Sequence, residues 1–412
     1  MKPTLRFIHC ADLHLDSPFK GIGLGLSSRL SQNIMESTFQ AFERVISHAL
    51  ENEVDFVLMV GDLFDQDGRS LKAQIRLKKG FETLHKAGIE VFLSHGNHDH
   101  TGGSFYPVQY PANVTIFNEE SVSTVPFYKN GEHAANIQGF SYSRRAIYEE
   151  KAAEYERTSE DVYHIGLLHG SIATNTDHDV YAPFRISQLN EAGHDYWALG
   201  HIHKRQILQE EPPVVYPGNI QGRHHKEDGA KGCYLVDLED TETTLTFLPT
   251  HSVLFQQITF DVSHIHTLSE LHDEVDKWKE ENRKVYGPMI FKIKIEGHLD
   301  GDEMREEALN SLVDVWNDKE EEEEAWMWLQ DIVVHSTPSW DREELKQGSH
   351  FVADLIRLID ESDEVDSMLA ELTTHKQGRR YVGTFSEEEK KEIISEAESY
   401  LLKSLLQEGR SE

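Results

Sequence analysis

Near the N-terminus the sequence reads LRFIHCADLH (residues 5–14), an apolar run that ends in an aspartate and a histidine. Four more short apolar runs end in a similar way, in Gly61-Asp62, Gly96-Asn97-His98-Asp99, His169-Gly170 and Gly200-His201-Ile202-His203. Short apolar runs that stop at glycine or at polar residues are typical of buried strands. The sequence therefore predicts five strands that deliver metal-binding side chains from their carboxyl ends.

The residue types in these clusters are ones that bind divalent metals. Carboxylate and amide oxygens and neutral imidazole nitrogens suit manganese, iron or zinc. Two metals about 3.5 to 4 Å apart need a shared carboxylate and can activate water for in-line attack on phosphorus, and Asp62 is our candidate for that bridge. Asp12 and His14 are two residues apart, as are His201 and His203, so on an extended strand each pair would leave the same face.

The ordered set of five motifs resembles the calcineurin-like metallophosphoesterases and, within them, the SbcD and Mre group of DNA-repair nucleases. The resemblance covers residues 1–250 strongly and the remainder loosely. CADLHLDSPF (residues 10–19) and YPGNIQG (residues 216–222) are most similar to the bacterial YhaO-type branch. Protein phosphatases of the superfamily typically read Gly-Asp-x-Val-Asp-Arg-Gly and Gly-Asn-His-Glu, and this chain differs at both places. The resemblance thus favours diesters over monoesters.

The resemblance implies a site for two divalent metals, manganese first, with iron or zinc as alternatives. It places Asp12, His14, Asp62 and His203 on the first metal, and Asp62, Asn97, His169 and His201 on the second. It implies that His98 contacts the scissile phosphate and assists the departure of the leaving oxygen, a common role for imidazole. Asp65 and Asp99 are either groups that orient the ligands or His98, or ordinary turn residues.

Composition limits the other interpretations. With 412 residues, 38% of them hydrophobic, the chain is long enough for two or three domains. It contains no apolar stretch long enough for a signal peptide or a membrane span, and its two cysteines give no disulfide framework. We therefore expect a cytoplasmic protein that does not contact membranes.

The net charge of −33 must be reconciled with a nucleic-acid substrate, because binding to the phosphate backbone rests on lysine and arginine. Residues 1–250 contain 22 basic and 34 acidic residues, and residues 251–412 contain 18 and 39. Contact with DNA would then be local or shared with a partner. The local candidates are Arg144-Arg145, Lys204-Arg205 and Arg223-His224-His225-Lys226, each of which is otherwise an ordinary solvated loop. The preferred candidate is Arg223-His224-His225-Lys226, in a loop after the last histidine cluster.

The order of elements predicts an α/β fold with three parts. In residues 1–250, strands alternate with helices over 26–50 and 71–87, and the resemblance implies two packed mixed β-sheets flanked by helices, the metallophosphoesterase fold. Residues 251–345 are expected to form a small α/β cap domain or an unrelated accessory domain. Its strands are predicted over 254–262, 289–296 and 331–335, and its helices over 267–285 and 303–328.

Residues 346–412 are expected to form a helical tail. Apolar residues between 351 and 359 lie along one helical face, and Ser386 followed by Glu389 predicts a capping box that opens a second helix. These helices either pack on the cap or on each other, or they dock on a partner. The resemblance implies that such a partner is the coiled-coil base of an SMC-like ATPase, which would supply a basic DNA surface.

The leading interpretation is a metal-dependent phosphodiesterase that cleaves DNA in DNA repair. The resemblance implies a manganese-preferring exonuclease with single-strand endonuclease activity, working as a homodimer with an SMC-like ATPase. One alternative is a small-molecule phosphodiesterase acting on cyclic nucleotides or nucleotide diesters, which the acidic composition favours. Another is a metal-binding scaffold without catalysis, which the presence of every expected ligand disfavours.

Overall fold

The computed structural model of the chain describes residues 2–19, 22, 25–65, 69–103, 106–174, 180–297, 306–336, 342–348, 350–361, 367–370 and 385–408. The protein divides into two compact units, one of Met1–Ile258, Ser269–Lys294 and Glu306–Val333, the other of Thr259–Leu268, Ile295–Arg305 and Val334–Glu412. The domain boundaries near residues 250 and 345 stay predictions.

The first sheet contains the strands predicted from the first three apolar runs. Its order is β12-β11-β1-β2-β3-β4, in which β1 to β4 run parallel while β11 is antiparallel to β1 and to β12. The strands are β1 (Leu5–Ala11), β2 (Phe56–Val60), β3 (Glu90–Ser94), β4 (Val114–Ile116), β11 (Gly232–Leu238) and β12 (Thr243–Pro249). Because β1, β2 and β3 are parallel, the polar residues that follow them meet at one edge of the sheet.

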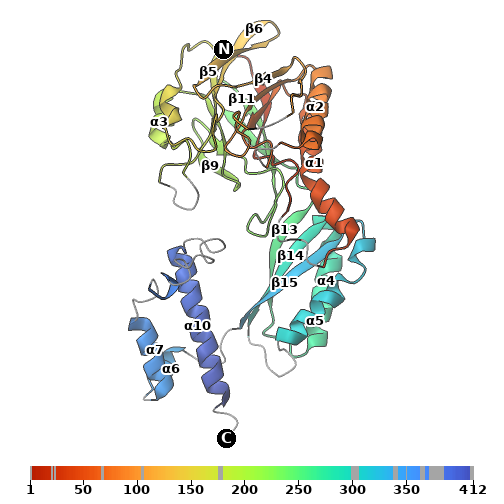
Figure 1. Ribbon diagram of the computed structural model, residues 1–412, viewed down its shortest axis with the longest axis vertical. Coiled ribbons are helices and arrows are strands. Elements are labelled where there is room, and N and C mark those ends of the chain that lie inside the picture. The colour runs from red at the N-terminus through yellow and green to blue at the C-terminus, as the bar shows by residue number, and fades with distance from the viewer. Residues whose placement is uncertain are drawn as a thin grey trace. The chain divides into compact units, whose positions relative to one another are not determined.

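Two helices cover one face of this sheet, α1 (Ser28–Glu51) and α2 (Leu71–Lys86), and both confirm the predicted helices (Figure 1). Each begins at a serine cap, because the side chain of Ser27 accepts a hydrogen bond from Leu30 N and that of Ser70 from Ala73 N. Their apolar faces form one core with the residues of β1 to β3 that point toward the helices.

The second sheet packs on the other face of the first. Its order is β5-β6-β7-β8-β10-β9. The strands are β5 (Ser123–Lys129), β6 (Glu132–Gly139), β7 (Tyr163–His169), β8 (Tyr196–Gly200), β9 (Gln206–Gln209) and β10 (Val214–Tyr216), with η1 (Lys151–Glu154) and α3 (Ile186–Ala192) in the connections. Phe7, Phe56 and Ile165 belong to the core between the sheets. With helices on one face and a sheet on the other, β1 and β2 are buried on both faces, which explains their continuous apolar runs.

The fold class predicted from sequence is therefore confirmed as two mixed sheets flanked by helices. The edge strands β5 and β9 escaped prediction, because in both most residues are exposed or only half-buried and the apolar run is short.

A third sheet, ordered β13-β14-β15, follows in the chain. It consists of β13 (Leu254–Asp261), β14 (Met289–Gly297) and β15 (Met327–Ser336), accompanied by α4 (Leu268–Tyr286), α5 (Glu306–Asn317) and η3 (Glu320–Glu322). The α4 residue Trp278 lies against Phe291 of β14, with ring centroids 5.5 Å apart, and Figure 1 shows α4 and α5 along this sheet.

The helix predicted over 303–328 is wrong beyond Asn317. The Asn317 side chain donates to Leu329 O at 2.7 Å and accepts from Leu329 N at 2.8 Å, so it pairs with the next strand instead of continuing the helix. Lys319 then turns the chain with a φ of +63°. Residues 303–305 of the predicted helix lie outside the described residues.

The tail contains α6 (Arg342–Lys346), α7 (Phe351–Glu361) and α10 (Glu387–Glu408). The predicted capping box is confirmed, because Ser386 N donates to Glu389 Oε2 at 2.8 Å and Glu389 N donates to Ser386 Oγ at 3.2 Å. Arg342 joins α6 to α10 through an ion pair with Glu398 at 2.5 Å. Among the helices that the structure describes, none combines the length and apolar character needed to cross a bilayer.

Candidate metal centre

All five predicted clusters lie at the carboxyl ends of strands, three in the first sheet and two in the second. Backbone hydrogen bonds join the loops, because His14 N donates to Asp62 O at 3.0 Å and Gly170 N donates to Gly200 O at 3.2 Å. The two sheets are linked at this edge by His201 N, which lies 3.1 Å from each carboxylate oxygen of Asp12. The packing of the sheets thus brings together side chains that are up to 191 positions apart.

The backbone at Asp12 and His14, and at His201, is not extended as the sequence interpretation assumed. Asp12, His14 and Asp62 have φ values of +51°, +41° and +47°, and His201 has +99°, so these residues are not part of an extended strand. Each sits where the chain leaves the strand and turns sharply. Left-handed backbone at a residue other than glycine costs on the order of 1–3 kcal/mol and is concentrated at functional sites. The prediction that the pairs leave one strand face is therefore wrong, although their side chains do converge.

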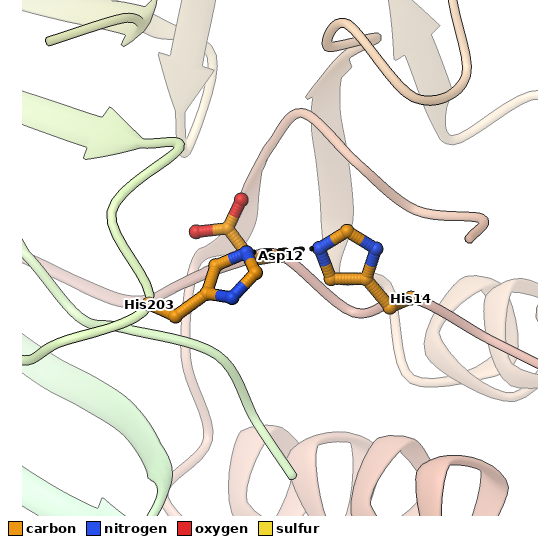
Figure 2. Close-up of side chains that lie close together, drawn as sticks. All are labelled: Asp12, His14 and His203. Atoms are coloured by element: carbon orange, nitrogen blue, oxygen red, sulfur yellow. Dashed lines mark hydrogen bonds between the residues drawn. The ribbon is translucent and has the colours of Figure 1, made fainter. Parts of the chain in front are cut away.

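The first group consists of Asp12, His14 and His203, whose ligand atoms lie within 4.8 Å of one another. Figure 2 shows the two imidazoles pointing toward each other beside the carboxylate. The Nε2 atoms of His14 and His203 are 3.1 Å apart. Asp62 Oδ2 lies 3.8 Å from His14 Nε2. The four residues implied for the first metal are thus together.

The second group is assembled around His169. Its Nε2 lies 3.5 Å from Asp62 Oδ2 and 3.0 Å from Asn97 Oδ1. His201 Nδ1 is 3.3 Å from the same Asn97 oxygen. Asp62 Oδ2 is therefore near one imidazole of each group, as a bridging carboxylate requires. Asp12 also clusters with Asp62 and His169, so it lies between the groups more centrally than the sequence suggested.

The charge states of these side chains fit divalent cations. Burial raises the pKa of Asp62, and burial together with the charge of Asp62 raises the pKa of Asp12 well above its usual range. Burial lowers the pKa of His14 and His203, and lowers that of His169 to about 4, so these imidazoles are neutral near pH 7. Neutral nitrogens and two repelling carboxylates in one buried cluster make a site that bound cations would stabilise.

The tautomer of His169 agrees with a ligand role. Its Nδ1 lies 3.1 Å from the carbonyl oxygen of Val60, to which it donates, so the Nε2 lone pair faces Asp62.

His98 lies beside the groups without joining either. Its backbone N donates to Asp62 Oδ1 at 2.9 Å, and its Nδ1 donates to the carbonyl oxygen of Asp65 at 3.0 Å. Its ring centroid is 5.0 Å from that of His14. The side chain is half-buried. This position is suited to a group that meets the substrate rather than the metals.

Asp99 is buried and organises the loop around His98. Its carboxylate accepts from Gly96 N at 2.7 Å, from Leu63 N at 3.0 Å and from His95 Nδ1 at 3.0 Å. Asp99 therefore both holds a turn and fixes Leu63, the residue after Asp62, and Gly96, the residue before Asn97.

Asp65 contacts the first group directly. Its Oδ1 lies 3.5 Å from His14 Nδ1, accepts from Ser17 Oγ at 3.3 Å and pairs with Arg223.

The basic run expected to contact DNA is divided by the structure. Arg223 is only 14% exposed in its side chain and pairs with Asp65 and, at 3.6 Å, with Glu227. His224 pairs with Glu227 at 3.4 Å and is half-exposed. His225 and Lys226 are exposed. Arg223 therefore faces the metal groups, and the free surface of the run is formed by His225 and Lys226.

Glu227 is a residue that the sequence interpretation missed. Its Oε1 accepts from His203 Nδ1 at 2.6 Å, while its Oε2 accepts from Asn219 Nδ2 at 2.9 Å and from Arg223 N at 2.7 Å. Burial would raise the pKa of this carboxyl, but the His203 hydrogen bond and Arg223 hold it well below its usual range. In sequence Glu227 only follows a basic run, and nothing in that spacing distinguishes it from an acid on a loop surface.

Comparison with known proteins agrees with this geometry. The family model of the calcineurin-like phosphoesterases matches residues 5–205. The chain is 40% identical over 411 residues to the uncharacterized metallophosphoesterase YhaO of Bacillus subtilis, covering 98% of this chain and 99% of that protein. It is 25% identical to the DNA double-strand break repair protein Mre11 of Archaeoglobus fulgidus, covering 53% of this chain and 50% of that one. With Mre11 of Sulfurisphaera tokodaii the identity is 26%, covering 64% and 68%.

The resemblance inferred from the five motifs is confirmed by these similarities, including its YhaO-type branch. All five motifs lie within the family match, and the last of them, Gly200-His201-Ile202-His203, ends two residues before the final matched position. The chain belongs to the calcineurin-like metallophosphoesterase family.

Proposed function

We propose that the protein is a manganese-dependent phosphodiesterase that cleaves DNA in DNA repair, as an exonuclease with single-strand endonuclease activity. The observation that carries the chemistry is the position of Asp62 Oδ2, 3.8 Å from His14 Nε2 and 3.5 Å from His169 Nε2. The choice of DNA is supported by the similarity to relatives named as DNA double-strand break repair proteins.

When bound, two divalent cations supply Lewis-acid activation of water and neutralise charge on the phosphate. The residues of the chain provide the rest. The Asp62 carboxylate lies between the two groups of metal-binding side chains and sets their separation. Its Oδ1 accepts a hydrogen bond from His98 N at 2.9 Å. With Nδ1–H donating to Asp65 O, His98 has its Nε2 available to hold a proton for the leaving oxygen. Loss of that proton donor would slow the step in which the P–O bond breaks.

Because the protein carries a large net negative charge, it needs a basic surface, its own or that of a partner, to bind a polyanion such as DNA. Two features support this requirement. His225 and Lys226 provide a small exposed basic patch beside the metal groups. On the tail helices, Phe351, Leu358 and Tyr400 are 69%, 66% and 76% exposed. We propose that these helices dock on an SMC-like coiled-coil ATPase and that the enzyme acts as a homodimer within that complex.

The test is cleavage of an end-labelled linear duplex by the purified protein with Mn²⁺, with a chromogenic diester as a second substrate. Degradation of the duplex by wild type and not by His98→Gln would support the proposal, and the label pattern would give the polarity. Hydrolysis of the diester with intact DNA, even after the ATPase is added, would contradict DNA as the substrate.

The second candidate is a phosphodiesterase for cyclic nucleotides or nucleotide diesters, and the net charge of −33 favours it because a small substrate needs no basic surface. Turnover of cyclic nucleotides at rates above those on the chromogenic diester would select it.

A further inference from the structure

The two histidines of the first group are connected through three charged side chains, those of Asp65, Arg223 and Glu227. Glu227 Oε1 is 2.6 Å from His203 Nδ1, and Arg223 Nη2 is 3.6 Å from the same Glu227 oxygen. Arg223 Nη1 pairs with Asp65 Oδ1, which in turn lies 3.5 Å from His14 Nδ1. Since His14 and His203 face each other through Nε2, the contacts close into a ring.

This ring fixes which nitrogen of each imidazole carries the proton. His203 Nδ1 must be protonated, because a lone pair there would face the Glu227 carboxylate at 2.6 Å. The same argument applies more weakly to His14 Nδ1 opposite Asp65. Both Nε2 atoms then present lone pairs toward each other across 3.1 Å, an arrangement that is repulsive unless a cation lies against both.

The second group is built differently. His169 Nδ1 donates to the uncharged carbonyl of Val60 at 3.1 Å rather than to a carboxylate. A carboxylate behind an imidazole raises its strength as a ligand more than a carbonyl does, because the negative charge stabilises the donor nitrogen as it gives up electron density. The group behind the imidazole is therefore a carboxylate for His203 and a neutral carbonyl for His169.

We propose that Glu227 is a positioning residue for the first metal, with Arg223 as the counter-charge that allows Glu227 and Asp65 to be buried together. Glu227 is 6% exposed in its side chain, Arg223 14% and Asp65 15%, and without the guanidinium the two carboxylates would lie uncompensated around neutral imidazoles. Removing the Glu227 charge lowers the affinity for the metal held by His14 and His203 and does not change the affinity for the metal held by Asn97 and His169.

The inference rests on the two-metal site of the proposed function and not on DNA as its substrate. The test is therefore metal binding by the full chain without nucleic acid, measured by calorimetric titration with Mn²⁺ and by electron paramagnetic resonance. In Glu227→Gln the amide keeps the size of the side chain and removes its charge. The matched control is Glu210→Gln, which makes the same charge change at an exposed position outside the metal groups.

We expect Glu227→Gln to lose about 10- to 100-fold in affinity at one of its two manganese sites, with the other within about twofold of wild type. The resonance signal of a coupled pair would give way to that of a single ion, and Glu210→Gln would behave as wild type. Retention of the second ion shows that the variant is folded. If Glu227→Gln does not fold, Glu227→Asp is tested instead. It keeps the charge but withdraws the carboxylate from His203, and the same loss of affinity at one site, with the other retained, is expected.

Two wild-type affinities, or equal loss at both sites in a folded variant, would overturn the proposal. A wild-type protein that binds two ions and leaves DNA intact would instead contradict the proposed function and leave this inference standing.

Discussion

His98 Nδ1 lies 3.0 Å from the carbonyl oxygen of Asp65, and the backbone of the same histidine holds the carboxylate of Asp62. His98 is thus joined to the loop after β2 in two ways, by its ring to the main chain of Asp65 and by its own main chain to the carboxylate of Asp62, the proposed bridge. Substitution of the ring leaves the main-chain bond intact, so the role of the imidazole can be separated from that of the metal site.

His98→Gln should keep both metals and lose turnover by about 10²- to 10⁴-fold, the usual contribution of a positioned proton donor. Metal content by mass spectrometry and steady-state hydrolysis of the chromogenic diester provide the two readouts. His85→Gln, at an exposed position on α2, is the control and should be unchanged in both. A drop in metal content in His98→Gln would refute the assigned role.

Asp62→Asn should have opposite effects with and without metal. The fold raises the pKa of Asp62 by burial, so its ionised form destabilises the metal-free protein at pH 7.5, and the neutral amide relieves this cost. In EDTA the variant should melt higher than wild type by about 1–3 °C, whereas in Mn²⁺ it should melt lower because the bridge is gone. Asp161→Asn, an exposed control, should follow wild type in both buffers. A variant that melts below wild type in EDTA would contradict the argument.

Gly96→Ala should weaken metal binding strongly through steric conflict alone. A Cβ atom at residue 96 would lie 2.3 Å from Asp62 Oδ1 and 2.7 Å from His169 Nε2, closer than real contacts allow. Displacing both side chains should reduce manganese affinity by more than about 100-fold, given the 10- to 100-fold typical of indirect changes. Calorimetric titration measures the loss, and circular dichroism shows whether the sheets persist. Two tightly bound ions in this variant would mean that the loop is far more pliable than the structure shows.

His9 should make the protein sensitive to acid. Its Nδ1 lies 2.9 Å from Tyr196 Oη and its Nε2 lies 3.1 Å from Leu199 O, contacts that suit a neutral ring between the two sheets. Burial lowers its pKa to about 3, whereas the unfolded chain takes up the proton near pH 6.5. The stabilisation is thus complete above pH 6.5 and is lost as the pH falls from 6.5 toward 3.

At pH 4.5 this histidine should account for roughly 3 kcal/mol of lost stability relative to pH 7.5. His9→Gln can make the same two hydrogen bonds and should lose correspondingly less free energy of unfolding over that interval. Urea unfolding in EDTA at both pH values gives the comparison. Equal losses in the two proteins would show that His9 does not titrate on unfolding in this interval.

Lys226→Gln should weaken DNA binding without affecting the metals. If Lys226 contacts one phosphate, its loss should reduce the slope of log affinity against log salt by about 0.9. Fluorescence anisotropy with a labelled duplex at several salt concentrations measures the slope, using Ca²⁺ in place of Mn²⁺ to prevent cleavage. Lys86→Gln, exposed on α2, is the matched control. An unchanged slope would remove this loop from the DNA surface.

Local sequence was sufficient for much of the fold. The runs at residues 56–60 and 91–93 lie within β2 and β3 as predicted, because a strand buried on both faces must be apolar throughout. The helix predicted over 303–328 failed where local pattern was overruled, since the bond of Asn317 to Leu329 depends on a strand twelve residues away. A periodic run of apolar residues cannot reveal such a partner.

Apolar runs and the motifs that follow them are local features, so the α/β class, the family and the side chains at the strand ends could all be predicted from the residues alone. How these side chains meet depends on tertiary packing. The left-handed backbone of Asp12 and His201 arises where packed strands end against each other. The contact of Glu227 with His203, 24 residues apart, exists because two loops are brought together at one sheet edge. Contacts between distant loops depend on the packing of the sheets beneath them, and the spacing of residues along the chain does not encode that packing.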